Sequence, residues 1–164
     1  MSPVALNLYR YMLPAIVQLD LPLGVQNGSW NLLKFTFFNG ESIYDSYWYQ
    51  GESQAHAFML RAYDIKKKYK DCFTSLRPEM LVPTERAGLC ANKFPGKNRT
   101  LWTLYNQRYT TLSGPLLALD HVNGATYFDV WNNRPLLPKI ANGKAVISMR
   151  LGPQGIGCVS QVLP

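Results

Sequence analysis

Residues 125–159 have the sequence ATYFDVWNNRPLLPKIANGKAVISMRLGPQGIGCV, which alternates short runs of strand-forming residues with compact turns. The runs are rich in Val, Ile, Tyr and Phe, whereas the breaks NNRP, ANG and GPQG are rich in Asn, Gly and Pro. Short strands with a turn every eight to twelve residues or so are typical of an antiparallel sandwich or barrel. This stretch therefore indicates an all-β domain.

The same pattern extends outward from this stretch. Downstream, the run GIGCVSQV continues it, and upstream the runs are LVPTERAGLCANKF, TLWTLYNQ and PLLALDH, separated by FPGKN, LSG and VNG. The pattern begins near Leu76, so residues 76–164 are predicted to form an antiparallel β-sandwich domain. Because no low-complexity tract or flexible linker precedes it, we expect this domain to pack directly on residues 1–75.

Residues 1–75 show a different periodicity. Apolar residues within 4–18 fall close to helical spacing, although Pro14 bends or ends the run. The run LLKFTFF at 32–38 is apolar on both faces, which favours a buried parallel strand. Apolar residues within 52–73 recur at the three-and-four spacing of an amphipathic helix. The chain is therefore predicted to be α+β, with a helix-strand-helix segment ahead of the sandwich.

A single strand between two helices leaves its backbone groups without hydrogen-bond partners. Residues 1–75 are thus expected to be a piece of a larger structure. The apolar face of residues 4–18 and both edges of the strand at 32–38 need cover. We therefore expect tight association with another polypeptide, or with a second copy of this chain, over the apolar N-terminal segment.

The charge pattern and the length of the apolar runs argue against two classes of partner. The 164 residues carry a formal net charge of +7 with only 16% charged residues, and the cations are spread through predicted turns and strand ends. A nucleic-acid interface gathers cations on one element, so we expect no nucleic-acid partner. The dense run KKKYK at 66–70 lies late in a predicted helix, where cations complement the helix dipole. No apolar run reaches the roughly 18 residues of a membrane span, so we expect no membrane insertion.

The N-terminal segment is not expected to act as a signal peptide. Arg10 interrupts its apolar run and Pro14 cuts it, and no small-residue cleavage site follows. The compartment therefore stays open on these residues alone.

No metal or cofactor site is expected. The three cysteines show no CxxC spacing, and Glu52 with His56 makes a helical i, i+4 pair without a third ligand. The run GPQGIG lacks the Lys-Ser/Thr of a phosphate-binding loop. Cys90 and Cys158 both lie on predicted sandwich strands, and whether they pair in a disulfide stays open.

Three phrases carry a resemblance to a known family, namely ANKFPG at 91–96, TLWTLYNQ at 100–107 and the stretch at 125–159. They are similar to the β-sandwich that closes many (β/α)8-barrel glycoside hydrolases. The resemblance implies that the chain is the carboxyl-terminal portion or a subunit of a carbohydrate-active protein, with the last barrel elements followed by the sandwich. It favours an extracellular or periplasmic location. It also implies a mainly structural sandwich, which would cover the barrel through the apolar faces of Trp102, Leu104, Phe128 and Val130.

The same resemblance predicts a substrate rim after residues 32–38. If these residues form the last barrel strand, the polar side chains at its carboxyl end face the substrate. Carboxylates and amides bind sugar hydroxyls and aromatic rings stack on sugars, so the predicted substrate-binding residues are Asn39, Glu41, Tyr44, Asp45 and Trp48. The alternative is that residues 44–49, YDSYWY, form a packing seam against the β-domain.

Catalytic residues are not assigned by the sequence. Glycoside hydrolysis ordinarily uses two carboxyl groups that face each other across the scissile bond. In the resembling enzymes these groups lie on earlier barrel strands, so we expect the chain to be inactive alone.

Two other functional classes stay open. The chain could be a structural assembly subunit. It could also be a non-catalytic glycan-binding module that holds a sugar on an aromatic surface made by Trp102, Tyr105, Tyr109, Tyr127 and Trp131.

Overall fold

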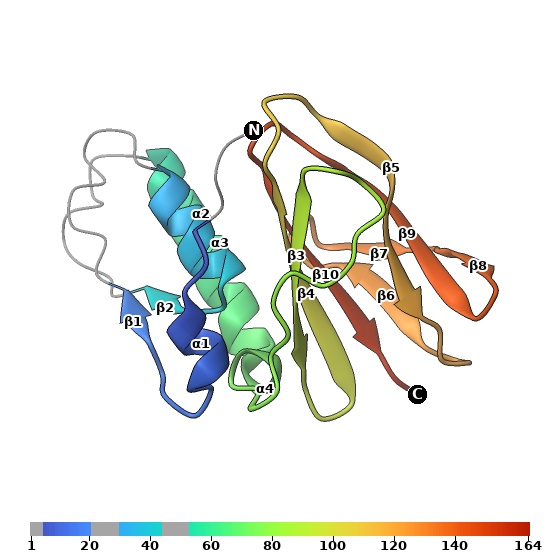
Figure 1. The fold of residues 1–164 in the computed structure, drawn as a ribbon, viewed down its shortest axis with the longest axis horizontal. Helices are drawn as coiled ribbons and strands as arrows, with labels where there is room; N and C mark the ends of the chain where they lie inside the picture. Colours follow the sequence, from blue (N-terminus) through green and yellow to red (C-terminus); the bar gives the residue numbers. More distant parts are fainter. Residues whose placement is uncertain (1–4, 21–29, 44–52) are drawn as a thin grey trace.

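The computed structural model describes residues 5–20, 30–43 and 53–164 of the chain. These residues form three layers, in which helices cover one face of a five-stranded sheet and a three-stranded sheet covers the other face (Figure 1). The predicted α+β class with antiparallel sheets is confirmed. No described helix combines the length and apolarity needed to cross a membrane.

The larger sheet is antiparallel throughout, and its strand order is β3-β4-β10-β6-β7. Its strands are β3 (Leu89–Pro95), β4 (Arg99–Asn106), β10 (Ile156–Val162), β6 (Thr126–Asp129) and β7 (Arg134–Leu136). The smaller sheet has the order β5-β9-β8 and is also antiparallel. Its strands are β5 (Leu112–Asp120), β9 (Lys144–Leu151) and β8 (Lys139–Ala141).

The larger sheet is buried on both faces, as the side chains of its strand β4 show. Trp102 and Leu104 belong to the cluster that fills the space between the two sheets. Leu101 and Tyr105 belong to a second cluster, shared with the helices. Because side chains alternate along a strand, a central strand buried on both faces carries apolar residues at successive positions.

The helical layer differs from the prediction. It consists of α1 (Leu8–Met12), α2 (Trp30–Phe38), α3 (Ser53–Lys68) and α4 (Lys70–Phe73). The predicted helix at 52–73 is confirmed except for a break at Tyr69, which separates α3 from α4. The predicted helix at 4–18 is mostly wrong, because only Leu8–Met12 is helical and a turn at Pro14 and Ala15 follows it.

The run LLKFTFF forms most of helix α2, so its assignment as a strand is wrong. Leu33 packs with Ala55 and Met59 of α3. The centre of the Phe38 ring lies 6.2 Å from the centre of the Tyr105 ring on β4. The run is apolar on both faces because α2 is covered by α3 on one side and by the sheet on another, and such a run does not distinguish a buried helix from a buried strand.

The N-terminal region contains a pair of parallel strands, and helix α2 lies between them in the sequence. Strand β1 (Leu19–Asp20) pairs in parallel with β2 (Ser42–Ile43), and Leu19 lies opposite Ser42. The described N-terminal region therefore follows the order α1-β1-α2-β2-α3-α4. A crossover helix between parallel strands is the βαβ unit of α/β proteins.

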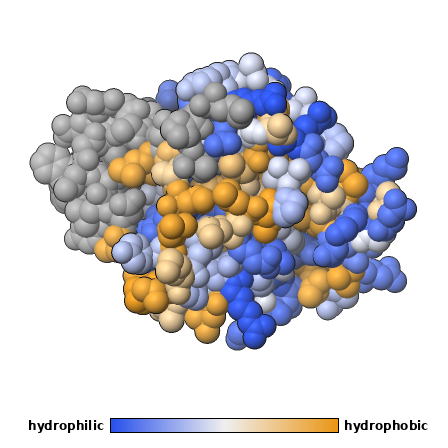
Figure 2. All heavy atoms as spheres, in the orientation of Figure 1, coloured by the Kyte–Doolittle hydropathy of each residue, from blue (hydrophilic) through white to orange (hydrophobic). Residues whose placement is uncertain are grey.

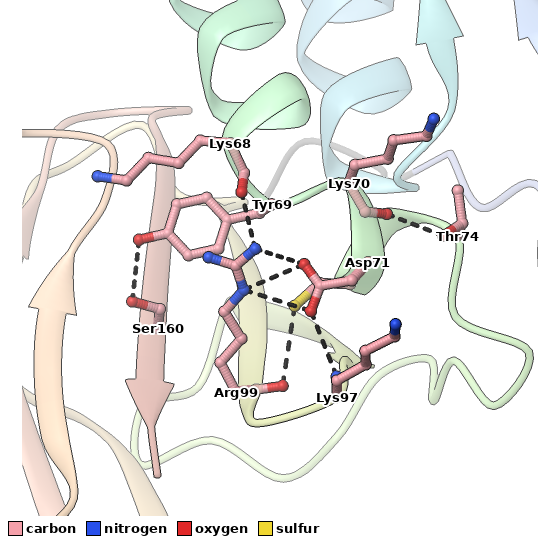
Figure 3. Close-up of polar contacts among 9 residues, drawn as sticks. Lys68, Tyr69, Lys70, Asp71, Thr74, Lys97, Arg99 and Ser160 are labelled. Atoms are coloured by element: carbon pink, nitrogen blue, oxygen red, sulfur yellow. Dashed lines mark hydrogen bonds and ion pairs between the residues drawn. The ribbon is translucent and has the colours of Figure 1, made fainter. Parts of the chain in front are cut away.

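Two sets of polar contacts join the helices to the larger sheet. At the end of α2, the Phe38 carbonyl accepts hydrogen bonds from Thr103 Oγ1 (2.6 Å) and Asn92 Nδ2 (3.1 Å). Around α4, Asp71 accepts from Arg99 Nε (3.1 Å), and the Arg99 guanidinium lies 4.6 Å from the centre of the Tyr69 ring (Figure 3). The hydrogen bond from Arg99 lowers the pKa of Asp71.

All three cysteines are free, so Cys90 and Cys158 do not form a disulfide. In the ladder, Cys90 lies opposite Tyr105 and Cys158 lies opposite Thr103. Burial raises the pKa of all three thiols, to about 12 for Cys72. None of them has the low pKa that a reactive thiolate requires.

Candidate functional site

Two of the predicted substrate-binding residues, Asn39 and Glu41, line one open hollow of about 510 Å³. The hollow lies where the N-terminal segment, β1 and α2 meet, and we call it the N-terminal hollow. Its lining residues are Ala5, Leu6, Asn7, Gln18, Leu19, Leu32, Phe35, Thr36, Asn39 and Glu41.

Asn39 and Glu41 lie at the opposite end of a strand from the one predicted. They follow helix α2 and precede strand β2, with Gly40 between them at φ 74°. They are therefore at the amino end of β2, because the supposed strand before them is a helix. In barrel enzymes the active site is at the carboxyl ends of the strands, and the amino ends serve stability.

Both side chains are buried and hydrogen-bonded within the chain. Asn39 is 3% exposed and Glu41 is 5% exposed. Asn39 Nδ2 donates to the Ala5 carbonyl (3.0 Å), and its Oδ1 accepts from the Asn7 backbone N–H (3.3 Å). Asn7 Nδ2 donates to Glu41 Oε1, and the Gln18 amide lies against the same Asn7 group. These contacts fasten the N-terminal segment to the turn between α2 and β2.

Glu41 also takes part in a buried group of charges. Arg10 is 4% exposed, donates from Nη2 to the Phe73 carbonyl (2.7 Å) and lies 5.5 Å from the centre of the Phe94 ring. Burial lowers the pKa of Arg10, and it lowers the pKa of Lys66 to about 7. The Glu41 carboxylate raises both pKa values, so its charge offsets the cost of burying these cations.

The N-terminal hollow does not hold the machinery for glycoside hydrolysis in the described residues. Glu41 is the one carboxylate among the residues that line it there, whereas hydrolysis needs a facing pair. Across the described ranges, no three His, Cys, Asp or Glu side chains gather as a metal site would require. The arrangement is suited to holding chain segments together.

The other three predicted substrate-binding residues, Tyr44, Asp45 and Trp48, lie outside the described residues. In the sequence they follow Ile43, the last residue of β2, and so come after the carboxyl end of that strand. Their role in a substrate rim stays a prediction, as does the alternative of a packing seam at 44–49.

The aromatic surface of the alternative glycan-binding hypothesis is not formed by its five residues together. Trp102 and Tyr127 are each 5% exposed and Tyr105 is 0% exposed, so all three belong to the interior. Tyr109 is 66% exposed, and Trp131 is partly buried against the helices. The sequence indicated aromatic residues on strands, but not which face of the sheet each one occupies.

Of the four apolar residues predicted to cover a barrel flank, two face the helical layer. Phe128 and Val130 contact the cluster shared with the helices, whereas Trp102 and Leu104 point into the space between the sheets.

Sequence reasoning also missed Asn7, the residue that links Asn39 with Glu41. It lies in an irregular segment, whose long-range contacts have no periodic signal.

Comparison with known proteins gives a likeness of fold. No family model and no curated protein matches the sequence. Among solved structures, a β-L-arabinopyranosidase from Geobacillus stearothermophilus has a TM-score of 0.53 at 6% identity, over 82% of this chain and 30% of that chain. A γ-CGTase from alkalophilic Bacillus clarkii has a TM-score of 0.52 at 14% identity, over 80% of this chain and 23% of that chain.

An α-amylase from Anoxybacillus has a TM-score of 0.51 at 13% identity, over 71% of this chain and 24% of that chain. This chain therefore spans about a quarter to a third of the length of these structures. At such low identity the likeness concerns the fold alone. The chain is similar in fold to part of several glycoside hydrolases, in line with the resemblance found in its sequence.

Proposed function

We propose that this chain is the carboxyl-terminal portion, or a separately encoded subunit, of a glycoside-hydrolase-like carbohydrate-active protein. In this proposal residues 1–75 supply the last barrel elements and residues 76–164 form a mainly structural β-sandwich. Catalytic groups come from other barrel strands, so the chain is inactive alone.

The observation that carries the proposal is the element order β1-α2-β2-α3 ahead of an antiparallel sandwich. Strands β1 and β2 pair in parallel over only two residues each, and within the described ranges they form a sheet of two strands. Such a pair needs further strands beside it. Neighbouring barrel strands would pair with the outer edges of this sheet and bury its side chains.

Exposed apolar side chains support the need for a partner. Met12 is 72% exposed and Val17 is 74% exposed, and Tyr9 and Ile16 are more than half exposed. Figure 2 shows hydrophobic residues on the part of the surface that carries α1. Several exposed apolar side chains on one short segment favour an interaction site. We infer that another polypeptide, bearing the remaining barrel strands, covers this surface.

The proposal divides the predicted site residues into two groups. Tyr44, Asp45 and Trp48 follow the carboxyl end of β2 and would contribute to the substrate rim of the assembled barrel. Asn39 and Glu41 precede β2 and would hold the amino end of the barrel together.

The test is the mass of the native assembly, with every polypeptide in it identified. The proposal expects one copy of this chain with a partner that carries barrel strands, and glycosidase activity in the assembly but not in the separated chain. Val17→Lys, within the exposed apolar segment, should release the partner. Leu137→Lys is the matched control, since Leu137 is 98% exposed and lies between β7 and β8, away from α1.

Two outcomes would contradict the proposal. A strictly monomeric native chain would remove the partner, and a large symmetric assembly of this chain alone would favour a structural subunit.

A further inference from the structure

A second hollow, of about 490 Å³, lies where helix α3 meets the turn between β6 and β7. We call it the junction hollow. It shares no lining residue with the N-terminal hollow, and it belongs to both parts of the chain. Its lining residues are Arg61, Asp64, Ile65, Lys68, Phe128, Val130, Trp131, Asn132 and Asn133.

The helical wall of the junction hollow comes from one face of α3. Positions 61, 64, 65 and 68 are spaced i, i+3, i+4 and i+7, so their side chains point the same way. Arg61 lies 5.5 Å from the centre of the Trp131 ring, and Lys68 lies 5.6 Å from the centre of the Phe128 ring. Figure 3 shows the Lys68 side chain directed away from Asp71.

The opposite wall is a rigid turn. Asp129 is 0% exposed, and its carboxylate accepts from the Asn132 backbone N–H (3.1 Å), from Asn132 Nδ2 (2.8 Å) and from Arg134 Nε (3.0 Å). Asn133 adopts φ 52°, a left-handed conformation that Asn tolerates well. The Trp131 ring packs 4.9 Å from Phe37 and 5.0 Å from Phe58, between ring centres. A wall held in this way loses little conformational freedom when a ligand binds.

The chemistry of the lining fits a sugar ring. Two partly buried aromatic rings, Phe128 and Trp131, provide an apolar floor. Asp64 can accept hydrogen bonds from hydroxyls, Arg61 and Lys68 can donate them, and the side-chain amide of Asn133 can do both. A pyranose has an apolar C–H face and hydroxyls that both donate and accept, so it uses every part of this lining.

Other small ligands use the lining less well. Asp64 lies between Arg61 and Lys68 on the same helix face, and its negative charge opposes the binding of a phosphate or of a nucleic-acid backbone. Arg61 and Lys68 are both exposed, and cation contacts with rings are weak at exposed sites. A sugar can therefore displace these cations from the ring faces and then bind them through its hydroxyls.

We propose that the junction hollow binds a pyranose unit of a glycan without cleaving it. The site needs only residues that this chain supplies. It therefore operates whether or not a partner completes the barrel, and its test is independent of the assembly experiment above.

The experiment is a ¹H–¹⁵N NMR titration of the full chain with maltohexaose, a galacto-oligosaccharide, an oligogalacturonate and inorganic phosphate. We expect at least one oligosaccharide to shift the Trp131 indole N–H and the Asn133 side-chain amide in a saturable way, with a dissociation constant in the millimolar range or lower. Trp131→Phe identifies the indole resonance.

Variants of α3 decide whether the binding uses the junction hollow. Asp64→Ala should raise the dissociation constant about tenfold, because a hydroxyl loses a charged acceptor. Lys68→Ala should raise it about threefold, whereas its neighbour Lys67→Ala, which lies outside the hollow, should change it less than about twofold. Thermal unfolding of each variant checks that the fold is kept.

The inference is overturned if no oligosaccharide shifts these resonances, or if Asp64→Ala and Lys67→Ala bind equally well. It is also overturned if phosphate alone shifts them, since the hollow would then be an adventitious anion site.

Discussion

Apolar side chains are buried in the space between the two sheets but exposed on the segment that carries α1 and β1. Leu116, Leu117 and Ile147 are 0% exposed between the sheets. Met12 is 72% exposed and Val17 is 74% exposed in the N-terminal segment. Both regions are rich in apolar residues, so composition alone does not distinguish them.

The difference lies in the number of layers that each region contacts. The space between the sheets has a sheet on each side, so the apolar side chains that point into it are covered from both directions. The N-terminal segment contacts the helices on one side, while its other side bears the exposed apolar residues. An apolar surface removed from water contributes to stability roughly in proportion to its area, so the two regions should respond very differently to truncation.

The largest effect is expected for truncation of the core between the sheets. Ile147→Ala should lower the free energy of unfolding by about 3 kcal/mol, because it leaves a cavity in the middle strand of the three-stranded sheet. Val17→Ala in the isolated chain should change it by less than about 0.5 kcal/mol. Urea unfolding of both variants makes the comparison. Equal losses would mean that the N-terminal segment is buried in solution.

A smaller effect, with a pH signature, is expected at Lys66. Its folded pKa of about 7 lies below the ordinary value of 10.5, chiefly because of burial. The folded protein therefore binds fewer protons than the unfolded chain between these values, and the free energy of unfolding rises with pH through this window. Below about pH 7 the penalty for the charged ammonium is fully present.

Lys66→Met should remove that penalty. We expect a gain of about 1 kcal/mol at pH 6.5, after allowing for the exposed part of the side chain, and a flatter rise of stability up to pH 10. Urea unfolding at several pH values measures both quantities. The exposed neighbour Lys67→Met is the control, and an identical pH profile in the two variants would contradict a charge penalty at Lys66.

The smallest effect is expected at the ion pair that joins α4 to the sheet. Asp71→Asn should lower the free energy of unfolding by about 0.5 kcal/mol at pH 7, because Arg99 loses a charged acceptor at a partly exposed site. The folded pKa of Asp71 lies below the ordinary 3.8, so this stabilisation is present above about pH 4 and is lost as the pH falls through the folded pKa.

The matched control is Asp120→Asn. Asp120 pairs with Lys144 at 2.6 Å, but its side chain is 90% exposed, so no measurable loss is expected. If both variants lose the same stability at pH 7, burial makes no difference to these two ion pairs.

The strands of the sandwich could be predicted from the sequence, because each is long enough to show its apolar residues between clear turn residues. The run KAVISMRL matches β9 (Lys144–Leu151), and TLWTLYNQ overlaps β4 (Arg99–Asn106). Strands β7 (Arg134–Leu136) and β8 (Lys139–Ala141) were missed, since three residues are too few to show a period of two.

The candidate site was only partly predictable. Asn39 and Glu41 were two of the five predicted substrate-binding residues, and both line the N-terminal hollow. Their position relative to the strand was wrong, because it depended on the assignment of residues 32–38. The junction hollow combines residues 61–68 with residues 128–133, and nothing in the sequence brings these two stretches together.

The antiparallel sheets and the long helix α3 follow from local periodicity and turn chemistry, so both could be predicted before any tertiary contact was known. That LLKFTFF is a helix depends instead on its tertiary contacts. Leu33 has buried partners on α3, and the ring of Phe38 lies near that of Tyr105. The Phe38 carbonyl, left free at the helix end, accepts from Thr103 and Asn92 of the sheet. An apolar run of this length satisfies either period, so its form depends on which neighbours can bury its side chains and pair its backbone groups.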